Sequence, residues 1–309
     1  MTISYTGPLG RAWQRMKWIL FATRDVKKWA ALGFTAWLAE LASASSWWDK
    51  GGSQARSDID VDQWGRVTTD AAHTIQEFLA RGIGAVLIIG LTLAALILYF
   101  VFLWLSSRGT FMFLDNVIHN RANVKAPWRH FSALGDSLFL WRVAFGVICM
   151  LAVVPIVVLL VVFSLPMILH EAGAAVSIPG YIGTGAVFFV LIVAMVYIDF
   201  LTMHCVVPLM YKHDLKIMEA WRRFLPVFKQ RVGAFVLYGF FYLLLSACVG
   251  VAVVLVGLVT CCVGWFVLAV PYVGTVLMLP VHVTLRGLDL EFLAQHGADL
   301  DLVQALASD

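Results

Sequence analysis

The chain has 309 residues, of which 61% are hydrophobic and only 13% are charged, and its formal net charge is +3. A soluble globule of this length needs more polar surface, so a polytopic membrane protein is predicted and soluble classes are excluded. The small net charge gives no reason to expect nucleic acid as a partner.

Six apolar runs follow one another along the chain, at 29–46, 83–105, 140–169, 181–210, 232–257 and 262–285. Most exceed the roughly 20 residues that a helix needs to cross about 30 Å of hydrocarbon. The runs are continuously apolar, whereas strands of membrane barrels alternate apolar and polar residues. The sequence therefore predicts an all-α integral membrane protein with six transmembrane helices.

Basic residues set the expected orientation. Six of them precede the first apolar run, which does not look like a cleaved signal, so the first helix is expected to stay as a span. Segments 1–28, 106–142, 211–231 and the tail from Arg286 hold 18 of the 22 Lys and Arg residues. The positive-inside rule then places both termini in the cytoplasm of a bacterial cell, as expected for a multi-pass protein of the inner membrane.

A tryptophan motif occurs three times, at Trp13, Trp128 and Trp221, each time ahead of a long apolar stretch. The two later copies superpose at an offset of 93 residues, which pairs Trp128 with Trp221. The repeat predicts one membrane domain over 1–309 made of three tandem helical hairpins. Its expected parts are units of about 9–105, 119–210 and 211–285, an outer loop at 47–82 and an acidic cytoplasmic tail at 286–309.

The segment around Trp221 suits an amphipathic interfacial helix, because Trp221 and Phe224 share a face and Arg222 and Arg223 can reach phosphates. Anionic lipids of the inner leaflet are the expected partners. The alternative is a polar connector whose tryptophan belongs to the aromatic belt. The residues expected to bind lipid or the interface are Trp13, Arg15, Trp128, Arg129, Trp221, Arg222 and Arg223.

Four ionisable residues lie inside the predicted spans: Glu40, Arg108, Asp199 and His204. A charge in hydrocarbon costs several kcal/mol unless it is paired or hydrated. Asp199 and Arg108 fall at similar depth on repeat-related helices, so an ion pair within roughly 4 Å is predicted. Its role stays open between a structural salt bridge, an ion or proton relay, and separate snorkelling to the surface.

Two further patterns carry expectations. Arg108, Asp115 and His119 share a helix face that Asn120 and Arg121 extend, which suits either a solvated surface or a site for lipid headgroups or a small anion. Pro208, Pro271 and Pro280 lie within predicted spans and predict local kinks, since each removes a backbone donor. Such kinks serve either packing or a transport site.

Signatures of catalysis are missing from the sequence. The histidines show no metal-ligand spacing, and there is no Walker loop, H-E-x-x-H or G-x-S-x-G motif. We therefore predict no enzyme activity, no catalytic residue, no metal and no cofactor.

A family resemblance rests on the string from Arg108 to Asn116, on Ala126-Pro127-Trp128 and on the stretch from Leu32 to Leu38. These residues resemble a broad set of uncharacterised prokaryotic membrane proteins, akin to the YciC-type proteins and to the membrane region of some glycerophosphodiester phosphodiesterases. The resemblance covers most of the chain and implies a six-helix bacterial membrane protein. The phosphodiesterase barrel of those relatives has no counterpart here, so no catalytic residue is carried over.

Two functions remain open from the sequence. The first is a non-enzymatic scaffold or accessory subunit that binds the inner leaflet, a membrane-protein partner or a second copy of the chain. The second is a transporter or lipid-handling protein built around Glu40, Asp199 and Arg108.

Overall fold

The structure is a computed structural model that describes residues 4–21, 26–41, 83–168, 174–260, 263–297 and 300–302. Every regular element in these ranges is a helix, which confirms the predicted all-α class. The expected outer loop at 47–82 lies outside the described residues.

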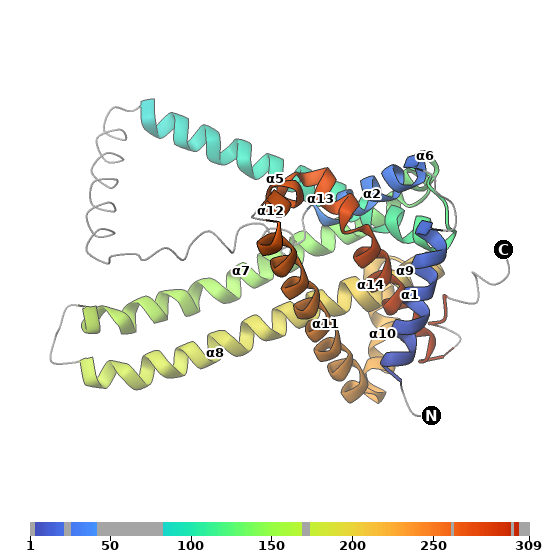
Figure 1. The fold of residues 1–309 in the computed structure, drawn as a ribbon. Coiled ribbons are helices and arrows are strands. Elements are labelled where there is room, and N and C mark those ends of the chain that lie inside the picture. The colour runs from blue at the N-terminus through green and yellow to red at the C-terminus, as the bar shows by residue number, and fades with distance from the viewer. Residues whose placement is uncertain are drawn as a thin grey trace.

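The short helices are α1 (Thr6–Phe21), α2 (Val26–Glu40), α6 (Lys125–His130), the π-helix η1 (Thr202–Val206), α9 (Val207–His213), α10 (Ile217–Gln230), α12 (Val263–Ala269), α13 (Pro271–Leu277) and α14 (Leu279–Ala294). The long helices are α5 (Ile83–Ile118), α7 (Ser132–Ile168), α8 (Ala174–Leu201) and α11 (Val232–Val259). Figure 1 shows α5, α7 and α8 extending as arms from the end of the molecule where α1, α6, α9 and α10 gather.

Four stretches are helical, long and apolar enough to cross a membrane: Val86–Ile118, Ser132–Ser164, Ile178–His213 and Val232–Val259. They coincide with four of the six predicted spans. The 36 residues of α5 make a helix of about 54 Å, which is longer than the hydrocarbon of a bilayer. Its apolar side chains from Val86 to Val101 are exposed on all sides, as expected for a lipid-facing arm.

The other two predicted spans differ from expectation, and the six-span arrangement is therefore not confirmed. Only 15 residues form α2, about 22 Å of helix, because it ends at Glu40. The run 262–285 is divided among α12, α13 and α14. Val270 is extended ahead of Pro271, as the residue before a proline prefers, and Pro280 starts α14.

α2 packs along the C-terminal half of α5. Gly109 permits this approach, since a Cβ there would lie 2.6 Å from Leu38 Cβ and 2.7 Å from the Ala39 nitrogen. The Ser106 hydroxyl donates to the Ala39 carbonyl at 2.7 Å. The small residues of α5 thus hold α2 against protein rather than lipid, although its composition resembles that of a span.

The main hydrophobic core lies where α5, α7, α9, α10, α11 and α14 meet. α10 contributes Ile217, Ala220 and Phe224, spaced for one helix face, and is strongly amphipathic. α14 corrects the sequence prediction: residues 286–294, expected in a cytoplasmic tail, belong to this helix, and Leu288, Leu290 and Phe292 are buried.

A short helix precedes a long one in α6 with α7 and in α10 with α11, while the repeat itself stays a prediction. However, α7 and α11 begin at Ser132 and Val232, which are 100 positions apart rather than 93. Trp128 is the fourth of the six residues of α6, and Trp221 is the fifth of the 14 residues of α10. The helices at all three motifs are described, while their location at a membrane interface stays a prediction.

Candidate functional site

Among the described residues, the most deeply buried carboxylate is that of Asp289 on α14, which is 1% exposed. His204 Nδ1 lies 2.9 Å from each of its oxygens. The Tyr238 hydroxyl donates to Asp289 Oδ1 at 2.6 Å, and Arg286 Nη1 lies 3.5 Å from Oδ2. Two potential cations and one hydroxyl therefore compensate the buried charge, as burial requires.

The π-helix η1 places His204 in this cluster. Pro208 lacks a backbone N–H, and the Val207 N–H donates instead to the Thr202 carbonyl, five residues back. The wider turn frees the Met203 carbonyl for the Arg286 guanidinium, which donates to it at 3.0 Å. At Pro208, where a kink was predicted, the structure shows a local change of helix type, and π-turns of this kind are frequent at functional sites.

Arg142 on α7 forms a second polar junction next to the first. Its Nη1 donates to Ser106 Oγ at 3.1 Å, and its Nη2 contacts Met203 Sδ at 3.1 Å. Asp199 on α8 lies within electrostatic range of Arg142 and of His204, and its side chain is exposed. The predicted residues Asp199 and His204 are therefore brought together, through an arginine that the sequence analysis had not selected.

Glu40 at the end of α2 pairs with a residue of the broken sixth run. His282 Nδ1 on α14 lies 2.7 Å from Glu40 Oε1. This contact joins the last residue of α2 to the first turn of α14. Glu40 was expected to need a partner, and His282, which the sequence analysis had not selected, is that partner.

Arg108 pairs with Asp136 on α7, and this corrects the predicted pair with Asp199. Arg108 Nη2 lies 2.9 Å from Asp136 Oδ1 and 3.0 Å from Oδ2. Its guanidinium carbon lies 4.3 Å from the ring centroid of Trp104 and 5.3 Å from that of Trp128. A bidentate acid and two aromatic faces fully occupy the guanidinium. The similar depth of Asp199 was not enough to predict contact, since α8 and α5 present these residues to different neighbours.

The N-terminal helix is joined to α14 by a second buried acid, Glu291. Arg11 Nε lies 2.6 Å from Glu291 Oε2, and Arg15 Nη2 lies 3.4 Å from Oε1. Gly287 lets the two helices approach, because a Cβ there would lie 3.3 Å from Ala12 Cβ. Burial lowers the pKa of Arg15 below its ordinary value, and the Glu291 carboxylate opposes part of that shift.

The residues predicted to bind lipid divide into two groups. Arg129, Arg222, Arg223 and Trp13 are exposed, with Trp13 at 47%. Trp128 and Trp221 are only partly exposed: Trp128 packs edge-on against Trp104 at 5.8 Å between centroids, and Trp221 packs against Trp141 at 6.0 Å. The two later tryptophans thus serve the packing between helices, and Trp13 alone of the three is exposed.

Taken together, these side chains form charge pairs between different elements. Within the described ranges, no three His, Cys, Asp or Glu side chains come close enough to hold a metal ion. The residues missed from sequence are Asp136, Arg142, His282, Asp289 and Glu291. Arg142 and His282 lie inside apolar runs, so the criterion applied to Arg108 would have found them.

Comparison with known proteins gives a family and no activity. No curated protein and no solved structure matches the chain. Nothing found relates it to the YciC-type proteins or to the phosphodiesterase membrane region, so that resemblance stays a prediction. The match that exists is to a family model over residues 6–303. Because the match covers nearly the whole chain, the protein belongs to this family, a family of unknown function designated DUF7544.

Proposed function

We propose that the protein is a non-enzymatic scaffold of the bacterial inner membrane, with both termini in the cytoplasm. Apolar arms hold it in the bilayer, and a braced set of shorter helices presents an outer face to a second membrane protein. The observation that carries the proposal is a set of four ion pairs, each between different elements. They are Glu40–His282, Arg108–Asp136, His204–Asp289 and Arg11–Glu291.

These pairs favour a structural role over a catalytic one. A side chain held in a charge pair must break that contact before it can act as an acid, a base or a nucleophile. Loss of one partner of a buried pair strands the other charge, which costs several kcal/mol. Such pairs brace the short helices against one another and against the long helices.

The outer face of α1 is a candidate binding surface for the scaffold. Trp18 is 60% exposed and Phe21 is 56% exposed, next to Trp13. Lys17 lies over the Trp13 ring, 5.6 Å from its centroid. Exposed tryptophans interleaved with cations are typical of interface anchors and of protein-binding hot spots.

Cross-linking in native membranes tests the proposal. The scaffold predicts that a reactive group at Gln14, on the exposed face of α1, joins a recurrent protein partner in fixed ratio. Replacement of Trp13 and Trp18 by alanine should abolish that cross-link while the melting temperature stays unchanged. A matched control replaces exposed Phe240 and Leu243 on the α11 arm, which should leave the cross-link intact. Reproducible isolation of the protein without any cross-linked partner would contradict the scaffold.

A second function, lipid handling, is favoured by one observation. The exposed Asp199 side chain lies within electrostatic range of Arg142 in a stretch otherwise surrounded by apolar side chains. A zwitterionic headgroup could pair with both charges there. Movement of labelled lipid between leaflets of proteoliposomes, lost in Asp199→Asn and kept in a variant of the exposed Glu219, would favour this function over the scaffold.

A further inference from the structure

A cavity of about 340 Å³ opens where the second half of α1 meets the end of α5. Arg15 and Trp18 line it from α1, and His119, Asn120 and Arg121 line it from the turn that follows α5. Apolar Ile19 forms part of the wall. The lining thus combines the guanidinium groups of Arg15 and Arg121 with the imidazole of His119 and the exposed indole of Trp18.

Arg15 has binding capacity left over in this cavity. One of its terminal nitrogens, Nη2, faces Glu291, but Nη1 is buried and has no hydrogen-bond partner among the described residues. A buried donor without a partner costs about 1–3 kcal/mol. Arg11 already makes the shorter contact with Glu291, at 2.6 Å, so the acid is shared between two arginines. A small rotation of the Arg15 side chain would bring this donor to an anion held in the cavity.

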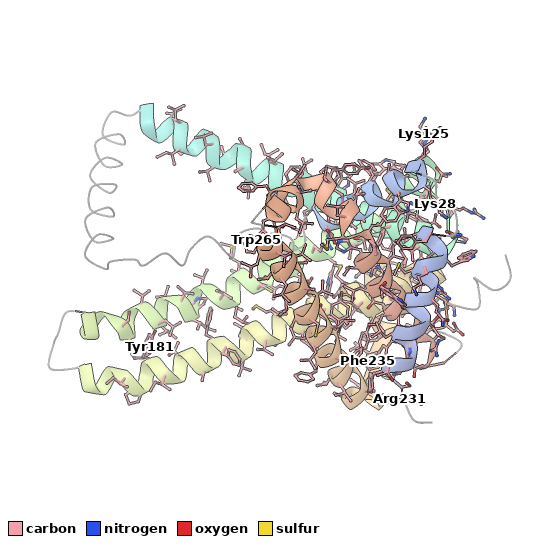
Figure 2. The ribbon with its side chains drawn as sticks, in the orientation of Figure 1. Lys28, Lys125, Tyr181, Arg231, Phe235 and Trp265 are labelled. Carbon is pink, nitrogen blue, oxygen red and sulfur yellow. The ribbon has the colours of Figure 1, made fainter. Side chains whose placement is uncertain are left out.

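The turn after α5 places a second guanidinium at the same opening. Asn120 adopts a left-handed conformation with φ 50°, and the Arg121 N–H donates to the Asn116 carbonyl at 3.1 Å. The Arg121 side chain is exposed and has no ion-pair partner in the part of the chain that the structure describes. Lys28 Nζ donates to Asn120 Oδ1 at 2.6 Å and brings a third cation to the rim, at the end of α2 labelled in Figure 2.

His119 has one ring nitrogen free for a ligand. Its Nδ1 lies 3.2 Å from Asp115 Oδ1, and the Tyr211 hydroxyl donates to that same oxygen at 2.7 Å. Asp115 is therefore occupied by its own partners, and Nε2 of His119 is the nitrogen left for a further contact. The C-terminus of α5 contributes about half a negative charge, which the full charges of Arg15, Arg121 and Lys28 outweigh.

We propose that this cavity binds a phosphoryl group, carried by the headgroup of an anionic phospholipid or by free phosphate. Two guanidinium groups on one cavity match the oxygens of a phosphate, for which planar bidentate donors are well suited. Trp18 beside the cavity, 60% exposed, is the residue type that lies at headgroup depth in membrane proteins. The site goes beyond the scaffold function and does not depend on it.

The test uses the full chain in detergent, with two probes. Native mass spectrometry counts bound phosphatidylglycerol against phosphatidylcholine, and calorimetry measures binding of inorganic phosphate. Arg121→Gln removes a side chain without an ion-pair partner, so folding should be unaffected. Arg231→Gln is the matched control, because it removes one exposed positive charge that lies well away from Lys28 and the cavity rim (Figure 2). Arg15→Gln is the second site variant, since Arg11 keeps Glu291 paired.

Arg121→Gln and Arg15→Gln should each weaken binding about fivefold, equivalent to about 1 kcal/mol, while Arg231→Gln binds as wild type. Loss confined to phosphatidylglycerol identifies a lipid headgroup as the ligand, and loss with inorganic phosphate identifies free phosphate. Equal binding by all variants with both probes would overturn the site. So would equal weakening by Arg121→Gln and Arg231→Gln, which would reduce the effect to overall charge.

Discussion

The rings of Tyr238 and Phe292 stack with 3.8 Å between their centroids and 6° between their planes. The hydroxyl of the same tyrosine donates to Asp289 Oδ1 at 2.6 Å. One side chain of α11 therefore joins the apolar core of α14 to its buried carboxylate. Because the stack holds the ring in place, the hydrogen bond forms with little further loss of side-chain freedom.

Tyr238→Phe should destabilise the protein by about 1–3 kcal/mol, the cost of leaving a buried acceptor short of a donor. The stack on Phe292 is retained, so the loss reports the hydroxyl alone. Thermal unfolding in detergent, followed by tryptophan fluorescence, measures it. Tyr242→Phe is the control, since that ring contacts His204 while its hydroxyl makes no hydrogen bond to another described residue. Equal melting temperatures for the two variants would contradict the assigned hydrogen bond.

Asp136→Asn should cost about 1 kcal/mol and no more, because Asp136 is 47% exposed and solvent screens its pair with Arg108. A double-mutant cycle with Arg108→Gln isolates the pair from other effects of either change. We expect a coupling free energy of about 0.5–1 kcal/mol for this cycle. The same cycle with Asp199→Asn should give none. Coupling of Arg108 to Asp199 would restore the pairing first predicted from sequence.

Much of the fold could be predicted because a long apolar run identifies a lipid-facing helix by itself. Val86–Ile118 and Ser132–Ser164 can be identified without tertiary contacts, since their length and apolar composition are enough to predict a helix in lipid. α2 could not be distinguished in this way, because helices buried against protein and helices buried in lipid have similar compositions. The contacts of Gly109 with Leu38 and of Ser106 with Ala39 show that α2 faces α5.

The candidate site shows the same limit. Glu40, Arg108 and His204 were each expected to need a partner, from the cost of burying charge. Their partners His282, Asp136 and Asp289 come from other helices, and no local spacing in the sequence encodes those contacts. Asp289 was assigned to a tail because it follows the last apolar run, although α14 continues past it and is buried from Gly287 to Leu293.

His296 should make stability depend on pH in the acid range. Burial lowers the pKa of His296 below its ordinary value of 6.5, against a hydrogen bond with the Phe292 backbone that raises it. His296 therefore binds a proton more readily in the unfolded chain than in the folded chain. The free energy of unfolding should be unaffected above pH 6.5 and should fall below it, by at most about 1.4 kcal/mol per pH unit, until the folded pKa is passed.

Unfolding curves between pH 8 and pH 5 check this, with His296→Phe as the test variant. The substitution should flatten the acid decline, because a phenyl ring cannot bind the proton and fits between Phe235 and Phe292. His130→Gln, at an exposed histidine, should leave the decline unchanged. An identical slope in the wild type and in His296→Phe would assign the decline to another group.

The last prediction concerns the two ends of the α7 and α8 arms. Figure 2 places Tyr181 near the far end of these arms and Lys125 at the opposite end, among the basic segments. If the positive-inside rule sets the orientation, Tyr181 lies outside and Lys125 and Lys216 lie in the cytoplasm. Cysteines at these three positions, in a chain whose five native cysteines are replaced by alanine, report this through an impermeant maleimide.

Intact cells should label Tyr181→Cys, while Lys125→Cys and Lys216→Cys should react only after the membrane is opened. The physical basis is α8, whose span Ile178–His213 separates Tyr181 from Lys216 across the bilayer. Labelling of both Lys125→Cys and Tyr181→Cys from outside would mean that α7 does not cross. Labelling of Lys216→Cys from outside would place α8 on one side of the membrane and remove the basis for an even number of crossings.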